Sequence, residues 1–172
     1  MERDFYTISV YVDKDENLIG IPCGESDKYQ IADIDTVLLL KAPYSDKAIE
    51  QFIDKVIDAC YTKKHNDNSN VSTIERYTKK KGFINATKDL TLITIVKTKQ
   101  SYSLMPTFND FEKGPVIIDD DERILINPYK EGTMAENIRS FIEIYVKANI
   151  FYKEMKEAEN RKNWCQCKIA PY

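Results

Sequence analysis

The order of apolar and polar positions predicts two similar hairpins. Residues 7–22 begin with alternating apolar and polar side chains, continue through a polar turn and end in a second apolar run that Pro22 closes. The same layout recurs 84 residues later, at 91–106, where Pro106 closes the second run. Alternation with a period of two is typical of strands with one buried face, and proline is poorly tolerated inside a strand. Each stretch therefore predicts two antiparallel strands joined by a turn.

Each predicted hairpin leads to a predicted helix by the same route. An acid-rich loop and a short apolar run come first, followed by a Pro-Tyr pair at 43–44 and at 128–129. An Ile-x-x-Phe-Ile run then occurs at 49–53 and again at 138–142. Apolar residues three and four positions apart form one face of an amphipathic helix. The two halves of the chain therefore have matching helices as well as matching hairpins.

The starts of the two helices also carry signals. Ser45 stands where an N-cap is expected for the first helix. Thr133 and Glu136 have the spacing of a capping box for the second. Between the halves, the polar stretch 61–73 predicts a linker, and a short helix with a break near Gly82 follows it.

These elements predict an α+β fold made of two β-β-β-α-type repeat halves, with antiparallel hairpins and a helix packing on each sheet. We expect 1–172 to form a single globular unit, with 1–61 as the first half-repeat, 62–90 as linker and short helix, and 91–172 as the second half-repeat with a C-terminal helical extension. The alternative is an α+β protein in which two strand-strand-helix runs occur by chance.

Composition narrows the classes of protein. Of the 172 residues 42% are hydrophobic, which is enough for a packed core, and the formal net charge is −3. The sequence contains no uncharged apolar run of about 18 residues and begins with a polar segment, so we expect a soluble, cytoplasmic protein without a membrane partner. A slightly acidic chain lacks the surplus of Lys and Arg on which nucleic-acid binding depends, so we do not expect nucleic acid as a partner.

Candidate catalytic chemistry is sparse. The single histidine, His65, lies in the most polar stretch, and we interpret it as a solvated linker side chain. The phosphate-binding glycine loops, the nucleophile elbow and the zincin helix have no counterpart in the sequence. Cys23, Cys60, Cys165 and Cys167 lack the spacing of a redox motif or a usual zinc site and are interpreted as reduced thiols. The sequence thus predicts no catalytic residue, no metal and no cofactor.

The strongest local charge lies between residues 108 and 122, where six acids face one lysine and the local charge is −5. The acids are Asp110, Glu112, Asp119, Asp120, Asp121 and Glu122. Three interpretations are open: a metal site, which lacks the spacing of an EF-hand; an ordinary acidic turn; and a recognition surface for a basic partner. Under the third interpretation, Phe108 and Tyr129 are candidate aromatic anchors beside the acids.

A basic segment offers a different function. Arg76, Lys79, Lys80 and Lys81 form either a solvated helix face or a site for RNA or an acidic partner, as in a regulatory or adaptor module. A third alternative is a carboxylate-based hydrolase that uses a metal.

Residues 72–150 carry a further set of motifs: an Ile-Glu-x-Tyr run at 74–77, a strand that ends in Pro-Thr at 106–107, Gly114 before the next strand, and a closing helix. This set resembles the immunity proteins of bacterial contact-dependent growth inhibition systems, in the branch once catalogued as a domain of unknown function. In two respects the chain departs from the pattern, because its closing helix is unusually long and Asn149 stands where a cysteine is expected.

The resemblance implies a non-catalytic cytoplasmic protein that binds the C-terminal domain of one cognate toxin and blocks it. Toxins of this kind are commonly nucleases, and a nuclease carries a basic groove for phosphates. An acidic inhibitor face complements such a groove. We therefore expect the acidic cluster of residues 110–122, with Phe108 and Tyr129, to form the contact set for a basic nuclease toxin; the sequence leaves the oligomeric state open.

Overall fold

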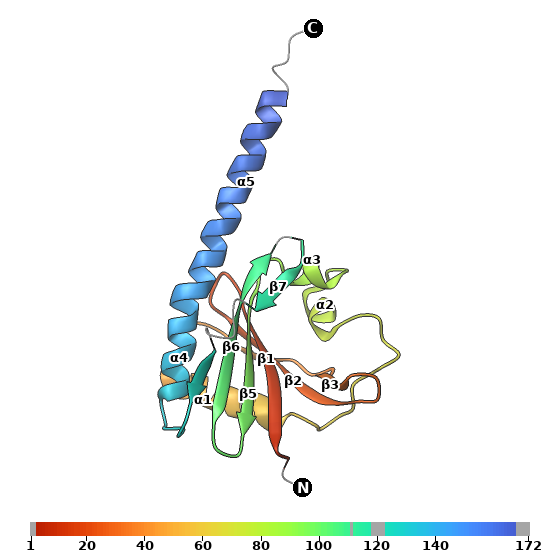
Figure 1. Cartoon of the computed structure of the whole chain (residues 1–172), viewed down its shortest axis with the longest axis vertical. Coiled ribbons are helices and arrows are strands. Elements are labelled where there is room, and N and C mark those ends of the chain that lie inside the picture. The colour runs from red at the N-terminus through yellow and green to blue at the C-terminus, as the bar shows by residue number, and fades with distance from the viewer. Residues whose placement is uncertain (1–2, 111, 118–122, 168–172) are drawn as a thin grey trace.

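The structure is a computed structural model that describes residues 3–110, 112–117 and 123–167, with the side chains described as far as Ala158. It confirms the α+β class: one eight-stranded antiparallel sheet is combined with several helices (Figure 1). The elements are β1 (Phe5–Val12), β2 (Leu18–Ser26), β3 (Gln30–Asp33), β4 (Leu38–Leu40), α1 (Asp46–Asp58), α2 (Thr73–Thr78), α3 (Phe83–Thr87), β5 (Thr91–Thr98), β6 (Tyr102–Asp110), β7 (Gly114–Ile117), β8 (Ile124–Ile126), α4 (Thr133–Phe141), the π-helix η2 (Ile142–Val146) and α5 (Lys147–Cys167).

The two halves of the chain join in this sheet through β1 and β5. These strands pair antiparallel over eight positions, from Phe5 opposite Thr98 to Val12 opposite Thr91. The strand order is β3-β2-β1-β5-β6-β7, with β4 also paired to β2 and β8 also paired to β6. Each half therefore has four strands with the same pairing, one more than the predicted three. A cis peptide bond precedes Pro43 in one half and the matching Pro128 in the other.

Helix α1 packs on the sheet through the apolar face that its sequence predicts. The Ser45 side chain accepts the backbone N–H of Ala48 and forms the expected N-cap. Val56 is fully buried against β2, where a Cβ atom at Gly20 would lie 2.4 Å from Val56 Cγ2. Glycine at this position lets the helix approach the strand closely.

One core unites the two halves on this face of the sheet. It contains residues of α1, α4 and the central strands, including Ile53, Ile138 and Ile95. The helices of both halves thus pack on one shared sheet, where the sequence suggested a helix for each of two sheets. The opposite face has a smaller cluster, in which Ile74 of α2 and Ala86 of α3 cover Tyr11.

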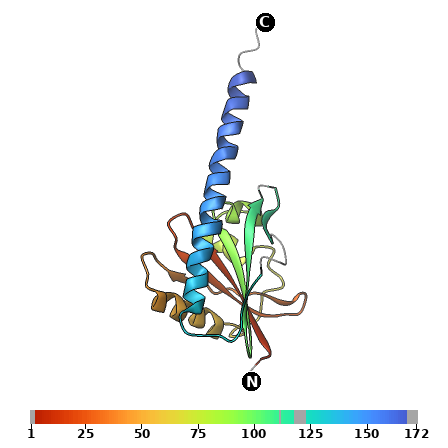
Figure 2. The same ribbon diagram turned by 60° about the vertical axis from the view of Figure 1, so that its left-hand side comes forward.

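The start of α4 differs from the prediction. Its N-cap is Gly132, at φ +89°, and makes no side-chain cap hydrogen bond, so Thr133 is the first helical residue and not the head of a capping box. The Glu136 N–H bonds to the Gly132 carbonyl instead. From there α4, η2 and α5 form one continuous column that runs along the sheet and projects well beyond it (Figures 1 and 2).

His65, in the segment between the halves, is not the solvated side chain that the sequence suggested. His65 is half-buried, and its Nδ1 atom lies 2.7 Å from the carbonyl oxygen of Asp33. Its backbone N–H donates to the carbonyl of Glu25. The histidine is therefore anchored to β2 and β3, because the linker returns along the sheet edge and brings it against their carbonyl groups.

Candidate functional site

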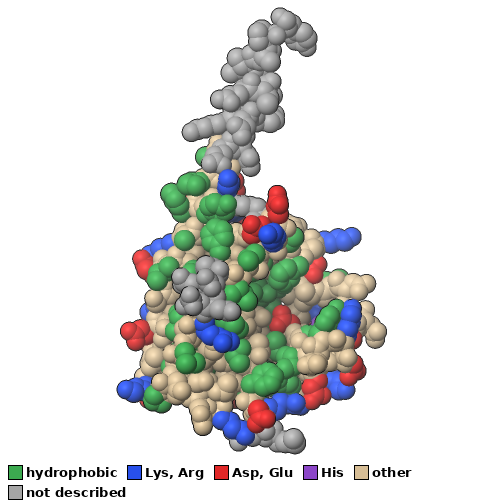
Figure 3. Space-filling model, in the orientation of Figure 1, with side chains coloured by type: hydrophobic (Ala, Val, Ile, Leu, Met, Phe, Trp, Pro, Cys, Tyr) green, Lys and Arg blue, Asp and Glu red, His purple; other side chains and the backbone are tan. Residues whose placement is uncertain are grey.

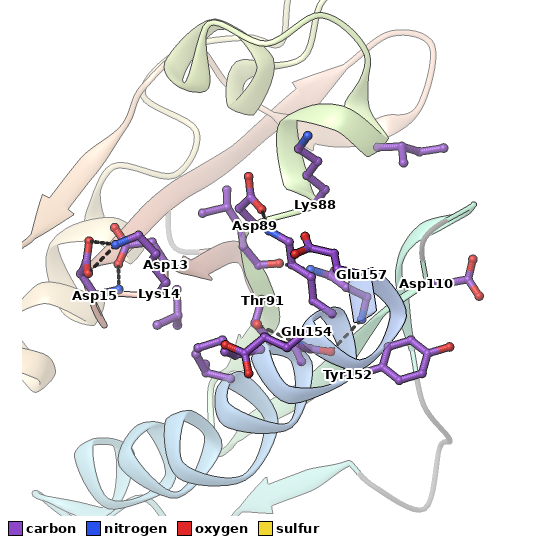
Figure 4. Close-up of a pocket in the computed structure, with 18 residues that line it drawn as sticks. Asp13, Lys14, Asp15, Lys88, Asp89, Thr91, Asp110, Tyr152, Glu154 and Glu157 are labelled. Atoms are coloured by element: carbon purple, nitrogen blue, oxygen red, sulfur yellow. Dashed lines mark hydrogen bonds and ion pairs between the residues drawn. The ribbon is translucent and has the colours of Figure 1, made fainter. Parts of the chain in front are cut away.

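A cavity of about 560 Å³ lies beside the first three turns of α5. Its walls come from the β1–β2 turn, the loop between α3 and β5, the end of β6 and the base of the helical column (Figure 4). Apolar side chains contribute much of the lining, among them Ile84, Leu90 and Ile150. This volume lies within the range of sites that hold a small ligand or a few inserted side chains.

The charged lining of the cavity is mainly acidic. Six carboxylates face three lysines, and they come from four separate stretches of the chain: Asp13, Asp15, Asp89, Asp110, Glu154 and Glu157 against Lys14, Lys88 and Lys153. Lys14 is paired with Asp15, at 2.8 Å. Glu154 and Glu157 are exposed, and they extend from the side of α5 that lines the cavity (Figure 4). The rim therefore carries a surplus of acidic side chains beside an apolar lining.

Asp89 ties the column to the rest of the protein. Its carboxylate pairs with Lys153 of α5 and, at 2.8 Å, with Lys80. Burial acts to raise the pKa of Asp89, but the hydrogen bonds and charges of the two lysines outweigh burial and lower that pKa to about 2. The carboxylate is thus ionised at neutral pH and holds the first turns of α5 against the α3–β5 loop.

Two asparagines and a threonine form a polar contact under the column. Asn149 is 8% exposed, its Nδ2 donates to Thr91 Oγ1 at 3.0 Å, and its Oδ1 accepts the backbone N–H of Asn109 at 3.2 Å. Asn149 is the residue that stands in place of the cysteine expected from the family pattern. Since a thiol is a weak hydrogen-bonding group, the asparagine makes a stronger link between the column and the ends of β5 and β6.

Three residues of the predicted contact set lie at or beside this cavity. Asp110 lines it, although its carboxylate accepts the backbone N–H groups of Glu112 and Lys113, which lower the pKa of Asp110. Glu112 is exposed in the same turn. Phe108 lies on β6 with its ring 5.0 Å from that of Tyr152, which also lines the cavity. The β6–β7 hairpin therefore brings these residues close to α5.

The structure does not bring Tyr129 to the same place. Its ring lies 5.0 Å from that of Tyr102, the first residue of β6, and its hydroxyl donates to Glu50. Asp110 is the last residue of β6, about 27 Å along the strand from Tyr102 at the usual rise per residue. Asp119, Asp120, Asp121 and Glu122 lie outside the described residues.

Other candidate sites are less open. Arg76 pairs with Asp35 at 3.2 Å and donates to the Val71 carbonyl, and Lys80 is paired with Asp89. Half of the basic segment is thus already engaged within the chain. No group of three or more His, Cys, Asp and Glu side chains suited to a metal ion occurs among the described residues. Within the same residues, no helix has the length and apolar character needed to cross a membrane.

The sequence signals for the cavity were incomplete. Asp13 and Asp15 lie in a hairpin turn, where acids are common for local reasons, and Glu154 and Glu157 lie in a helix of strongly polar composition. Neither context distinguishes a binding residue from a solvated one. Only their convergence in space marks them as parts of one rim.

Comparisons with known proteins establish the fold. No family model and no curated protein matches the chain. A solved protein of unknown function from Neisseria meningitidis has a TM-score of 0.62 at 10% identity, over 83% of this chain and 97% of that one. A chain of the CdiA-CT/CdiI toxin and immunity complex from Yersinia pseudotuberculosis has a TM-score of 0.59 at 11% identity, over 82% of this chain and 97% of that one. The shared architecture covers nearly the whole of both solved chains.

Proposed function

We propose that this chain is an immunity protein that binds and neutralises the toxin domain of a contact-dependent growth inhibition system in the cytoplasm, without catalysing a reaction. The observation that carries the proposal is the fold it shares with a chain of a toxin and immunity complex over 82% of its length. The motif resemblance of residues 72–150 to immunity proteins favours the immunity side of such a pair over the toxin side.

The acidic cavity rim supports a basic toxin, and a nuclease is the toxin class we propose. A nuclease active site holds phosphates with Lys and Arg, and the rim keeps a surplus of carboxylates, six against its three lysines and the Lys80 that pairs with Asp89, which presents the opposite charge. Clustered charge of this kind speeds association and orients the partners before the contact forms. Asp110, Glu112 and Phe108 remain in the proposed contact set, and Glu157 joins them from α5.

Co-expression with the toxin gene immediately upstream tests the proposal. We expect growth of cells that express the toxin to be restored, and the two proteins to co-elute in gel filtration. Expression of the chain alone is the control, and it should leave growth unchanged. Toxicity of the chain alone, or absence of both rescue and complex, contradicts the proposal.

A pair of charge reversals tests whether the rim is the docking face. Glu157→Lys places a positive charge on the rim, whereas Asp58→Lys makes the same change in net charge at an exposed position of α1, outside the cavity lining. At low salt we expect Glu157→Lys to slow association with the toxin by about threefold to tenfold, because rim charges act mainly on the association rate. Asp58→Lys should have little effect. Equal effects of the two variants would mean that the rim acts only through net charge.

A further inference from the structure

The helical column has an apolar stripe on its outer side. Ile144 is 57% exposed, Phe151 64% and Met155 42%, and Ala148 is also exposed. In sequence these residues are four, three and four positions apart, the alternation of a coiled-coil seam. Three large exposed apolar side chains in one line are unusual on a protein surface, and such patches are typical of interaction sites.

This stripe faces away from the protein's own core. The inner side of the column consists of Ile142, Val146 and Asn149, all buried, at the same alternating spacing. Phe151 follows Asn149 by two positions, a rotation of about 200° around a helix, so the two lines lie on opposite sides. In Figure 2 the column stands in front of the sheet, and no other described element covers its outer side. Figure 3 shows apolar side chains gathered where the column leaves the body.

Charged residues beside the stripe indicate which helix fits it. Lys147 and Glu154 are both exposed and lie seven positions apart, hence on the same flank of the stripe. Lys147 already pairs with Glu143 of its own chain, an exposed contact that leaves its ammonium group able to meet a second carboxylate. In two antiparallel copies related by a two-fold axis near residues 149 and 150, Ile144 meets Met155 of the other copy and Ala148 meets Phe151. Lys147 of each copy then lies beside Glu154 of the other. The small Ala148 side chain leaves room for the large Phe151 ring.

We propose that two copies of this chain associate through the outer side of η2 and α5, as an antiparallel helix pair with Ile144, Ala148, Phe151 and Met155 in its seam. The contact is isologous, because the same stripe serves both copies and each Lys147–Glu154 pair occurs twice. The described seam, from Ile144 to Ala158, is about 22 Å long. A contact between two helices over this length buries less surface area than a standard stable interface. The dimer is therefore reversible and forms at micromolar or higher concentration.

Sedimentation velocity of the purified full chain, without toxin, tests the dimer. Between about 1 and 500 μM we expect the mass to rise from that of the 20.0 kDa monomer toward twice that value. Phe151→Ser removes an apolar side chain from each copy and should raise the dissociation constant at least about a hundredfold. The control is Leu125→Ser, which removes a side chain of similar exposure (63%) from β8, and it should leave the dissociation constant unchanged.

A charge swap tests the orientation. Lys147→Glu and Glu154→Lys each turn two attractive contacts between the copies into repulsive ones and should each raise the dissociation constant about tenfold. Lys147→Glu also removes the pair with Glu143 inside each chain, so thermal melts at low concentration measure that separate loss. In the antiparallel arrangement the double variant restores two opposite-charge pairs and should recover most of the affinity. Circular dichroism checks that all variants keep the helix.

Three outcomes would overturn the proposal. A constant monomer mass across the concentration range excludes the dimer, and if Phe151→Ser then weakens toxin binding, the stripe belongs to the toxin interface. Dimerisation that Phe151→Ser does not affect places the contact elsewhere. Failure of the double charge variant to recover affinity rejects the antiparallel register. The measurement needs no toxin, so it stands or fails independently of the proposed immunity function.

Discussion

Helices α1 and α5 differ in how the fold uses their apolar residues. In α1 the apolar residues lie on one face and are buried, with Ile49 and Val56 fully inaccessible. In the described part of α5 and the preceding η2, apolar residues lie on both sides, and Phe151 on the outer side is 64% exposed. The inner side of α5 even uses a polar residue, Asn149, as a buried contact.

This difference indicates that the apolar residues of α1 stabilise the fold, whereas the outer ones of α5 are available for contact with another molecule. The large apolar residues of α1 all belong to the chain's own core, where they pack with residues of the sheet and of α4. The exposed apolar residues on the outer side of α5 have no packing role within one chain among the described residues. An apolar side chain that stays exposed adds little to folding and is available to a partner. Substitutions on the two helices should therefore have very different effects.

The largest effect is expected from Ile53→Ala in α1. Ile53 is 1% exposed and belongs to the core shared by both halves. Its truncation leaves a cavity that the rigid sheet cannot fill, so the free energy of unfolding should fall by about 2–5 kcal/mol. Urea denaturation followed by circular dichroism measures it. A loss below about 1 kcal/mol would mean that α1 is not held as tightly as its burial indicates.

A smaller effect is expected from Asn149→Ala on the inner side of α5. The change leaves the backbone N–H of Asn109 and the hydroxyl of Thr91 without their present partner. The unfolding free energy should fall by about 1–3 kcal/mol, the cost of leaving buried polar groups unpaired. Hydrogen exchange at the Asn109 amide checks the mechanism, since its protection should decrease more than that of the central strands. Unchanged protection there would contradict the proposed role of this asparagine.

Asp89→Asn tests the charged link between α5 and the body, and its effect depends on pH. The pKa of Asp89 in the folded protein is about 2, below the value of about 3.9 for an unfolded chain, so the ionised group stabilises the fold above about pH 4. At pH 7 the variant should lose less than about 1 kcal/mol, because the three side chains remain about one-third exposed. The difference from the parent should shrink as the pH falls toward 2. A difference that is constant from pH 7 to pH 2.5 would attribute it to packing.

The smallest effect on folding is expected from Phe151→Ser on the outer side of α5. At a concentration low enough for monomers, the unfolding free energy should change by no more than about 0.5 kcal/mol. Thermal melts at low and high concentration measure it. A large loss at low concentration would show that the Phe151 ring packs within its own chain, which would remove the contrast between the two helices.

Much of the fold follows from local pattern. The hairpins, the Ser45 N-cap and the matching helices were predicted because period and capping chemistry act over a few residues. The predicted strand ends at Pro22 and Pro106 were wrong, because β2 continues to Ser26 and β6 to Asp110, where each pairs with a further short strand. The predicted capping box at Thr133 was wrong, because the N-cap lies one residue earlier, at Gly132, whose positive φ suits glycine. The sequence pattern alone does not show which of the two residues becomes the N-cap. The joining of the halves through β1 and β5 was not predicted, because it depends on pairing between distant strands.

The candidate site was predicted only in part. Phe108, Asp110 and Glu112 were selected by local charge and do lie at or beside the cavity. Tyr129 was grouped with them by proximity in sequence, but the extended strand β6 separates the two places. In the sequence Asp89 is a single acid without a distinguishing pattern, and its structural role comes from the ion pairs with Lys80 and Lys153.

The sequence by itself determined the α+β class, the repeated order of strands and helices, and an acidic character in the second half, because each depends on neighbouring residues. The tertiary structure decided which acids converge on one cavity and which face of the long helix stays uncovered. Contacts between residues far apart in the chain settle both questions, and their geometry exists only after the sheet has formed. A local pattern can therefore indicate which side chains carry charge or apolar surface, while only the folded chain shows which of them lie together on an open surface.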